Sequence, residues 1–369
     1  MSKKSCNSTA ECAKKTSIGG QALIEGIMMR GPKHSAMAVR DPDGEIVLEK
    51  WENKVSKRSK VFKLPIIRGV FNFADSMIAG YKCLMRSAEI AGLDEEEPKS
   101  KKKKTAEAFV EESCEAADTQ VLSEESSEQE SSEEKDKENS KEKSGSALMS
   151  AVMVISTVIG VGLSIVLFIM LPSFIFEWIS KLLPALKPQN AAAASLIKSV
   201  FEGVLRIAVL VLYMLLVTLM KDIRRTFMYH GAEHKTIFCY ESGMELTVEN
   251  VKAQRRFHPR CGTSFLILML IVGMIISFFI DPLFLAITNS VPHVAVRTLI
   301  KLLLLPITMG IGYELIKIAG RHQNLFTRII SAPGMWLQHI TVLEPTDDMI
   351  ECAIKAFVEV IPEDESDKF

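Results

Sequence analysis

The chain has 369 residues, of which 48% are apolar and 24% are charged, with 44 basic against 45 acidic side chains. A net charge of −1 excludes the strongly basic surface that is typical of nucleic-acid binding. Because the apolar residues are unevenly spread, the composition of each segment says more than the average.

The N-terminal part of the chain predicts a small β unit and a helix. Residues 1–16 are polar and predict disorder, whereas residues 17–55 are short apolar runs cut by glycine and proline. The turn sequence DPDG (residues 41–44) predicts a hairpin between "SAMAVR" and "EIVLEKW". Residues 64–93 have apolar side chains at helical spacing behind Pro65, but they are too polar to span a membrane. We therefore expect an antiparallel unit followed by an amphipathic helix.

A charged stretch of low complexity follows this helix. Residues 94–146 are rich in Glu, Lys and Ser, and they cannot bury enough apolar area to offset their chain entropy. This stretch predicts a disordered tether.

Four apolar runs then predict membrane-spanning helices. Residues 151–172 contain no charged side chain, and about 20 helical residues cross the hydrocarbon core of a bilayer. The remaining runs are 203–220, 264–280 and 297–319, the last of which is interrupted by Lys301, Pro306 and Glu314. The sequence thus predicts an α-helical polytopic membrane protein, with about four transmembrane helices and a small cytosolic β-containing N-terminal unit.

Basic residues beside these runs orient them. Lysines and arginines follow the second run, precede the third and follow the fourth, and no cleavable signal peptide is visible. Both termini and the loop 221–262 are predicted to be cytoplasmic, and residues 173–202 to form an outside loop with an amphipathic stretch. All seven cysteines fall on the reducing side, so metal ligation or burial is expected in place of disulfides.

Several charged residues stand in apolar surroundings. Glu25 and Arg30 predict an ion pair buried under the sheet. Glu314 should face the helix bundle, where Lys317, one turn further on, would satisfy it.

The chain ends with a predicted amphipathic helix. Thr346 is placed to cap it, and acidic residues occupy its first turn. Its apolar face is predicted to hold Ile350, Ala353, Ile354, Phe357 and Val358.

The sequence "YHGAEHK" has the spacing of two metal ligands on a helix. His230 and His234 lie at i and i+4, so their rings project from one helix face, about one turn apart. Glu233 takes the general-base position of the inverted zincin pattern H-x-x-E-H.

The sequence "FHPRCGTSF" supplies a second pair of ligands, His258 and Cys261, with the form of a zinc knuckle. Three hypotheses remain open: no metal, a closed structural site that uses all four ligands, or an open catalytic site. The open site would hold two histidines, one further ligand and a water activated by Glu233. Its further ligand is one of His258, Cys261, Glu241, Glu245 and Glu249.

The motifs "GGQALIEGIMMRGP", "RTFMYHGAEHKTI", "HPRCGTSF" and "APGMWLQHITVLEP" resemble those of the bacterial YqhQ-like proteins. The resemblance covers nearly the whole chain outside its first residues and the tether. It implies a multi-pass membrane protein and a metal-dependent enzyme. The site residues that it implies are His230, Glu233, His234, His258 and Cys261.

Two classes of function follow. In one, a zinc-dependent hydrolase of the bacterial inner membrane attacks an amide or ester, with Lys235 or an arginine near 255–260 stabilising the oxyanion. In the other, the protein is a non-enzymatic assembly, chaperone or quality-control factor, and its metal is structural or absent. The expected partners are the lipid bilayer and other membrane proteins, with no nucleic acid. A transporter is disfavoured because Glu314 is the one acid inside a predicted span.

The predicted divisions of the chain are 1–16 (disordered), 17–93 (β unit and helix), 94–146 (tether), 147–320 (transmembrane bundle with the metal-site loop) and 321–369 (cytosolic C-terminal segment).

Overall fold

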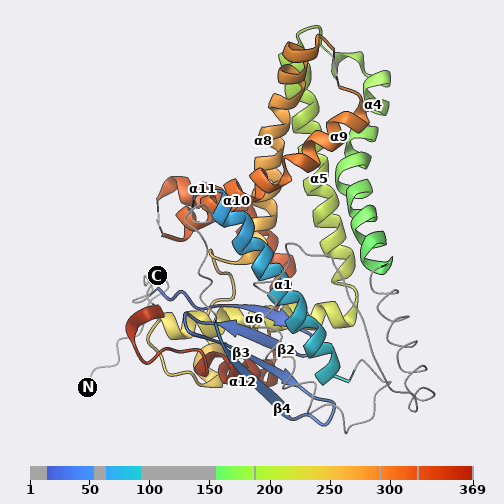
Figure 1. Cartoon of the computed structure of the whole chain (residues 1–369). Helices are drawn as coiled ribbons and strands as arrows, with labels where there is room; N and C mark the ends of the chain where they lie inside the picture. The colour runs from blue at the N-terminus through green and yellow to red at the C-terminus, as the bar shows by residue number, and fades with distance from the viewer. Residues whose placement is uncertain are drawn as a thin grey trace, which may run out of the picture. The chain divides into compact units, whose positions relative to one another are not determined.

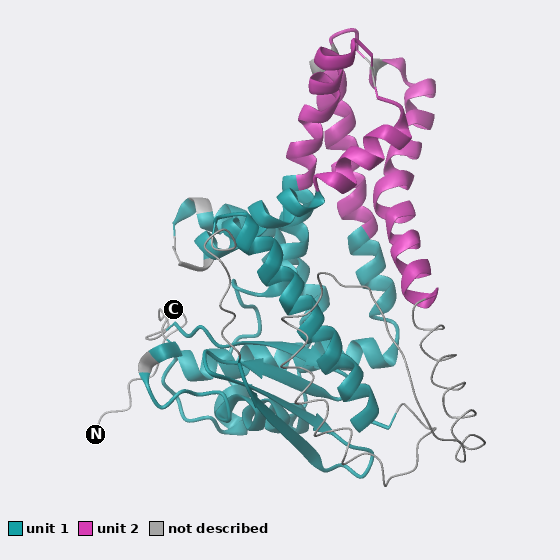
Figure 2. Ribbon diagram, viewed as in Figure 1, with its two compact units in different colours: residues 1–117, 210–272, 305–369 teal, residues 118–209, 273–304 magenta. Residues whose placement is uncertain are grey.

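The protein is described by a computed structural model. The described residues are 15–53, 64–92, 155–186, 188–290, 292–321 and 324–367. Most of the predicted disordered N-terminus and the whole predicted tether lie outside them. The chain forms two compact units, one from residues 1–117, 210–272 and 305–369 and the other from residues 118–209 and 273–304 (Figure 2). We call them unit 1 and unit 2 and describe each by itself.

Unit 1 contains a four-stranded antiparallel sheet in the described residues, with strand order β1-β2-β3-β4. The strands are β1 (Gly19–Leu23), β2 (Gly26–Arg30), β3 (His34–Arg40) and β4 (Ile46–Glu52). The predicted DPDG turn joins β3 to β4, where Arg40 pairs with Ile46. The turn between β1 and β2 places Glu25 at φ 50°, a conformation that side chains other than glycine rarely adopt.

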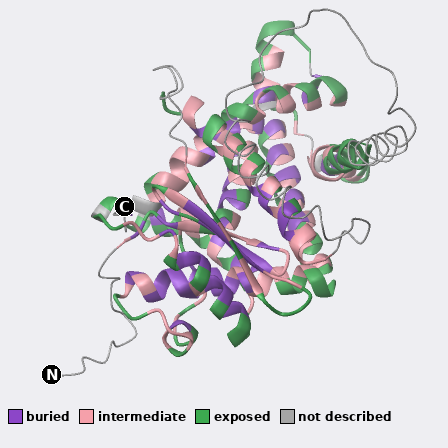
Figure 3. Cartoon of the chain, turned by 60° about the horizontal axis from the view of Figure 1, so that its bottom comes forward, coloured by how far each residue is buried: buried purple, intermediate pink, exposed green. Residues whose placement is uncertain are grey.

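Helices cover both faces of this sheet (Figure 1). Ile27 and Met29 of β2 point to one face, towards α6 (Lys221–Glu241) and α12 (Asp347–Val358). Met28 points to the other face, where Cys83 of α1 (Ile67–Ile90) packs. Successive strand side chains alternate between faces, so β2 and β3, covered on both faces, are buried at most positions. Figure 3 shows the buried residues concentrated on these strands and on the helices against them.

The C-terminal helix α12 begins after Thr346, as predicted, with Asp347 and Asp348 in its first turn. The Thr346 side chain makes no capping hydrogen bond, and Val358 is 51% exposed, so the prediction was wrong in these two details. The buried face instead contains Met349, Ile350, Cys352, Ala353, Ala356 and Phe357.

The predicted partner of Glu25 was also wrong, and Glu314 has a partner besides Lys317 that was not predicted. Glu25 accepts hydrogen bonds from Nε and one terminal nitrogen of Arg225, whereas Arg30 is exposed. Glu314 lies on α10 (Leu305–Arg321) and accepts two hydrogen bonds from Arg68 of α1, at 2.7 and 2.5 Å. Because sequence neighbours were chosen as partners in both cases, the long-range ion pairs were missed.

Three helices within the described residues are long and apolar enough to cross a membrane, and a bent pair raises the number to as many as four. They are Ile155–Leu182, Ala193–Val217 and Gly262–Thr288, with Val294–Leu303 and Leu305–Ala319 as the bent pair. Figure 1 labels their parts α4 (Leu171–Leu182), α5 (Ala191–Val217), α8 (Gly262–Thr288), α9 (Val294–Leu303) and α10.

The predicted outside loop at 173–202 is mostly helical. The first long helix contains a π-helical turn, η2 (Val166–Met170), and continues through α4 to Leu182. Helix α5 begins at Ala191, so it brings Glu202 into the candidate span. The apolar run used for the prediction began one residue after this glutamate.

Candidate metal centre

Helix α6 is buried along almost all of its second half although that half is rich in polar residues. Tyr229, Gly231 to Cys239 and Glu241 are all buried. The helix packs against β1, β2, α12 and the short α7 (Val248–Lys252). A buried polar side chain is costly unless it is hydrogen-bonded, so the partners of these residues define what the helix can do.

Three potential ligand atoms converge beside α6, from His230, His234 and Cys261. One ligand atom of each residue lies within 4.8 Å of the other two. His230 Nε2 is 3.1 Å from Cys261 Sγ, near the separation of about 3.5 Å that a nitrogen and a sulfur have on one tetrahedral zinc ion. His234 and Cys261 are buried and His230 is half-buried.

The other nitrogen of each histidine ring faces a backbone carbonyl. His230 Nδ1 donates to Thr341 O at 3.0 Å, and His234 Nδ1 donates to Arg256 O at 2.6 Å. Because a carbonyl oxygen only accepts, Nδ1 of each ring is the donor in these contacts, and in the neutral form of each ring Nε2 carries the lone pair. Metal-binding histidines are held in this way, so the three residues fit a zinc ion in donor type, protonation and spacing.

Close approaches between distant segments position these donors. A Cβ on Gly231 would lie 1.9 Å from Leu343 O, so only glycine lets the segment after α11 (Leu325–Thr341) approach α6 here. Leu343 N–H donates to Phe227 O at 3.0 Å, which fixes the Thr341 carbonyl next to His230. The glycine that weakens the helical pattern of "YHGAEHK" is thus required by packing.

The turn that carries Cys261 is fixed by Gln338 of α11, which is fully buried. Gln338 Oε1 accepts the N–H of His258 at 2.9 Å, and its Nε2 donates to His258 O at 2.8 Å. Cys261 N–H closes the turn on the same carbonyl at 3.3 Å. The sequence did not predict the role of Gln338, which stood out only as part of the motif "APGMWLQHITVLEP". It also did not predict that the Thr341 and Arg256 carbonyls would orient the histidines.

His258 lies beside this group and faces other partners. Its Nδ1 accepts the Arg260 N–H at 3.3 Å, and its Nε2 lies 3.7 Å from Glu241 Oε2. Burial lowers the pKa of His258 to about 4, against the opposing attraction of Glu241. Both ring nitrogens face groups outside the three-donor set, so the structure does not bring all four predicted ligands together.

Glu233 is buried between α6 and β1. Its Oε1 accepts the Gly20 N–H at 3.1 Å. Burial raises the pKa of Glu233, and attraction to His230 and the Gly20 hydrogen bond oppose that rise. A carboxyl group one helical turn from a ligand histidine, with a raised pKa, is suited to accept and release a proton.

The remaining candidates have other partners. Lys235 Nζ donates to Lys252 O at 2.8 Å and pairs with Glu344, and Arg260 pairs with Glu241. Glu241 also accepts the Thr16 N–H at 2.9 Å, so this acid is held by the chain itself.

The comparisons with known proteins agree with the resemblance that the motifs suggested. The family described as "Protein of unknown function (DUF1385)" matches residues 64–363. The chain is 31% identical to "Uncharacterized protein YqhQ" of Bacillus subtilis (strain 168) over 347 residues, which cover 93% of this chain and 92% of the relative. The chain belongs to this family. No solved structure matches it.

Proposed function

We propose that the protein is a multi-pass membrane protein of the bacterial cell membrane and acts as a zinc-dependent hydrolase at the cytosolic side. The apolar helices support the membrane assignment, and the basic residues beside them support cytosolic termini. The observation that carries the hydrolase is the convergence of His230, His234 and Cys261, with both histidine rings held through Nδ1.

Three protein donors are the number that a catalytic zinc site uses, because the fourth position must stay open to water or substrate. His258 would close the site, but its ring nitrogens face Arg260 and Glu241. A zinc ion bound by the three donors would supply a Lewis acid that polarises a carbonyl and acidifies water. The matching substrates are amides or esters.

Glu233 is the proton-transfer group in this proposal. The Gly20 N–H holds one carboxylate oxygen, which restricts the side chain to one orientation beside α6. From there Glu233 would take a proton from the attacking water and deliver it to the leaving group. Because Lys235 and Arg260 are already paired, we assign no oxyanion donor.

A structural zinc site is the second candidate, and burial favours it. His234 is 1% exposed and Cys261 is 5% exposed, which leaves little of the donor set open to a substrate. In that case the ion would join α6 to the turn before α8, and the protein would assist the assembly or quality control of other membrane proteins.

Metal content tests the site itself. Elemental mass spectrometry on the full chain, purified in detergent without chelator, should give about one zinc per chain. His230→Ala and Cys261→Ser should lose that zinc. Zinc at background in the parent, or equal zinc in the parent and both variants, would overturn both candidates.

Glu233→Gln separates the two candidates. The variant should keep its zinc and lose chelator-sensitive hydrolysis of p-nitrophenyl ester and fluorogenic peptide amide probes. Glu45→Gln, the same change at an exposed acid of unit 1, is the matched control and should keep both. If the parent binds zinc and is destabilised by chelator but hydrolyses no probe, the structural candidate replaces the hydrolase.

A further inference from the structure

Unit 2 contains a second group of buried polar residues, unrelated to the metal centre. It consists of charged side chains on α5, α8 and α9, all inside candidate spans. None is more than 13% exposed. They are Glu202, Arg206, Asp281, Arg297 and Lys301.

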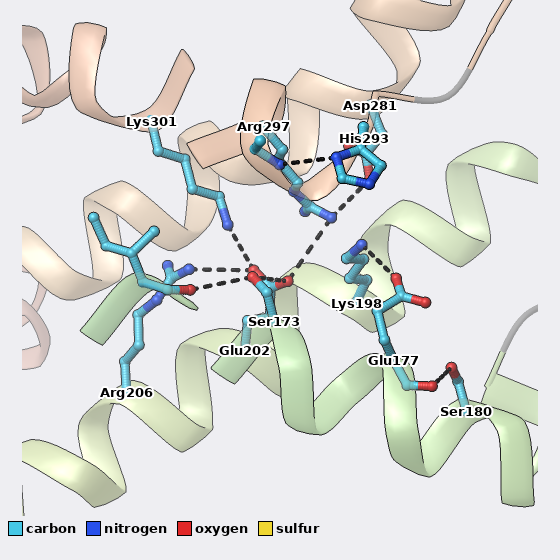
Figure 4. Close-up of polar contacts among 12 residues, drawn as sticks. Ser173, Glu177, Ser180, Lys198, Glu202, Arg206, Asp281, His293, Arg297 and Lys301 are labelled. Atoms are coloured by element: carbon cyan, nitrogen blue, oxygen red, sulfur yellow. Dashed lines mark hydrogen bonds and ion pairs between the residues drawn. The ribbon is translucent and has the colours of Figure 1, made fainter. Parts of the chain in front are cut away.

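Glu202 is the centre of this charged cluster, as Figure 4 shows. Its fully buried carboxylate receives Lys301 Nζ at 2.7 Å and Arg206 at 3.2 Å. Ser173 Oγ donates to the same carboxylate at 2.9 Å. Every oxygen of Glu202 is therefore already in use.

Positive charge exceeds negative charge in this cluster. Three cations, Arg206, Arg297 and Lys301, face two carboxylates, Glu202 and Asp281, which leaves a net charge of 3 − 2 = +1. Ionised groups among apolar helices are costly and are normally paired with one another. By formal charge the cluster thus has one basic side chain more than it has carboxylates.

Arg297 lies within ion-pair distance of two carboxylates but leaves its hydrogen-bond donors unused. It is 2% exposed, and none of its three guanidinium nitrogens makes a hydrogen bond within the described part of the chain. One nitrogen lies 3.0 Å from Asp281 and 3.8 Å from Glu202, yet in poor orientation for a hydrogen bond. Within the described residues, the buried Ser199 hydroxyl of α5 also makes no hydrogen bond. Asp281 Oδ1 is likewise buried without a hydrogen bond within the described residues. Three unused guanidinium donors beside a formal excess of basic side chains fit an anionic ligand.

The helix geometry beside the cluster is irregular. Arg206 Nε donates to Phe168 O at 2.8 Å, and Phe168 lies in the π-helical turn η2. Such turns are rare in helices and occur frequently at functional sites. This independent observation supports a binding role over simple structural pairing.

We propose that the charged cluster of unit 2 binds a singly charged phosphate oxyanion through Arg297 and Lys301. The planar fork of a guanidinium matches two oxygens of a phosphate, and one negative charge balances the cluster. A phosphodiester of a phospholipid headgroup and dihydrogen phosphate share this chemistry. Arg297 and Lys301 lie four residues apart on α9, so a rotation of Arg297 away from Asp281 turns both groups to one ligand.

The test uses the full chain in detergent, with two readouts. Phosphorus analysis after serial detergent washes follows the loss of tightly bound phospholipid, and equilibrium dialysis of the delipidated protein measures the binding of radiolabelled inorganic phosphate. Arg297→Gln should weaken binding about tenfold or more, because a hydrogen-bonded charge is lost. Lys198→Gln is the matched control, since Lys198 pairs with Glu177 outside the cluster.

Asp281→Asn keeps the proposal testable if Arg297→Gln does not fold. Removing this carboxylate frees Arg297 and raises the net charge of the cluster, so phosphate should bind more tightly or phospholipid should be lost more slowly. Retention of phospholipid without phosphate binding identifies the lipid as the source, and the reverse identifies free phosphate. Neither ligand on the parent, or binding that both variants leave at the parent's level, would overturn the proposal.

Discussion

Replacing Gly231 by alanine should destabilise unit 1 and release its metal. The added Cβ would lie 1.9 Å from Leu343 O, although real contacts stay above 3.0 Å, so the two must separate by at least 3.0 − 1.9 = 1.1 Å. Overpacking of this kind costs about 1–3 kcal/mol, and the strained hydrogen bond from Leu343 to Phe227 adds about 1 kcal/mol. The better helix propensity of alanine offsets about 1 kcal/mol of this, so the free energy of unfolding should fall by about 1–3 kcal/mol in total.

Thermal unfolding of the full chain in detergent measures this loss, and zinc content measures its effect on the site. Zinc should fall because the displaced segment carries the Thr341 carbonyl that holds His230. Gly262→Ala is the control, because a Cβ on Gly262, next to Cys261, would meet nothing within 4 Å. The reasoning fails if Gly231→Ala is as stable as the parent or about 1 kcal/mol more stable, as expected for a glycine on a free helix surface.

Three further outcomes test the packing around the site. Gln338→Leu should lower the free energy of unfolding by about 2 kcal/mol, since it removes both hydrogen bonds to the His258 backbone. It should also weaken zinc binding, measured by competition with a chelator. Unchanged zinc affinity would show that the turn holds Cys261 without Gln338. Phe357→Ala should lower the free energy of unfolding by about 3–5 kcal/mol, because Phe357 is fully buried and its ring centroid lies 5.1 Å from that of Tyr240. Val358→Ala, at an exposed position, is the control and should change the free energy of unfolding by less than about 0.5 kcal/mol. Chelation should lower the melting temperature of the parent, because zinc near a hundredfold above its Kd stabilises the folded state by on the order of 3 kcal/mol, and it should leave Cys261→Ser unchanged.

Local signals in the sequence predicted local structure well. The DPDG turn, the proline before α1 and the acidic residues at the start of α12 each act within a few residues, and the corresponding elements are present. The turn at Glu25 was not predicted, because a positive φ at a residue other than glycine gives no signal in composition. Its carboxylate pairs with Arg225, two hundred residues away, and no local pattern could indicate that partner.

The metal centre could be predicted only in part, for the same reason. The spacing of His230 and His234 is a property of one helix, and the turn of Cys261 is also local. His258 does not join the other three ligands because its ring nitrogens face Arg260 and Glu241. Only the folded structure supplies these partners. Glu202, the central acid of the charged cluster in unit 2, was missed because the predicted span began after it, whereas α5 begins at Ala191.

The centre brings together three parts of unit 1 that are distant in the chain. Helix α6 supplies the histidines, the turn before α8 supplies Cys261, and the end of α11 supplies the Thr341 carbonyl. Before folding these groups are separated by tens of residues, so they have no common affinity for zinc until the segments meet. In the proposed zinc site, the free energy of metal binding would then be part of the free energy that folds unit 1. Substitutions at Gly231 and Gln338, neither of which offers a ligand atom, should therefore lower zinc affinity and stability together, whereas Glu233→Gln should leave both near the parent.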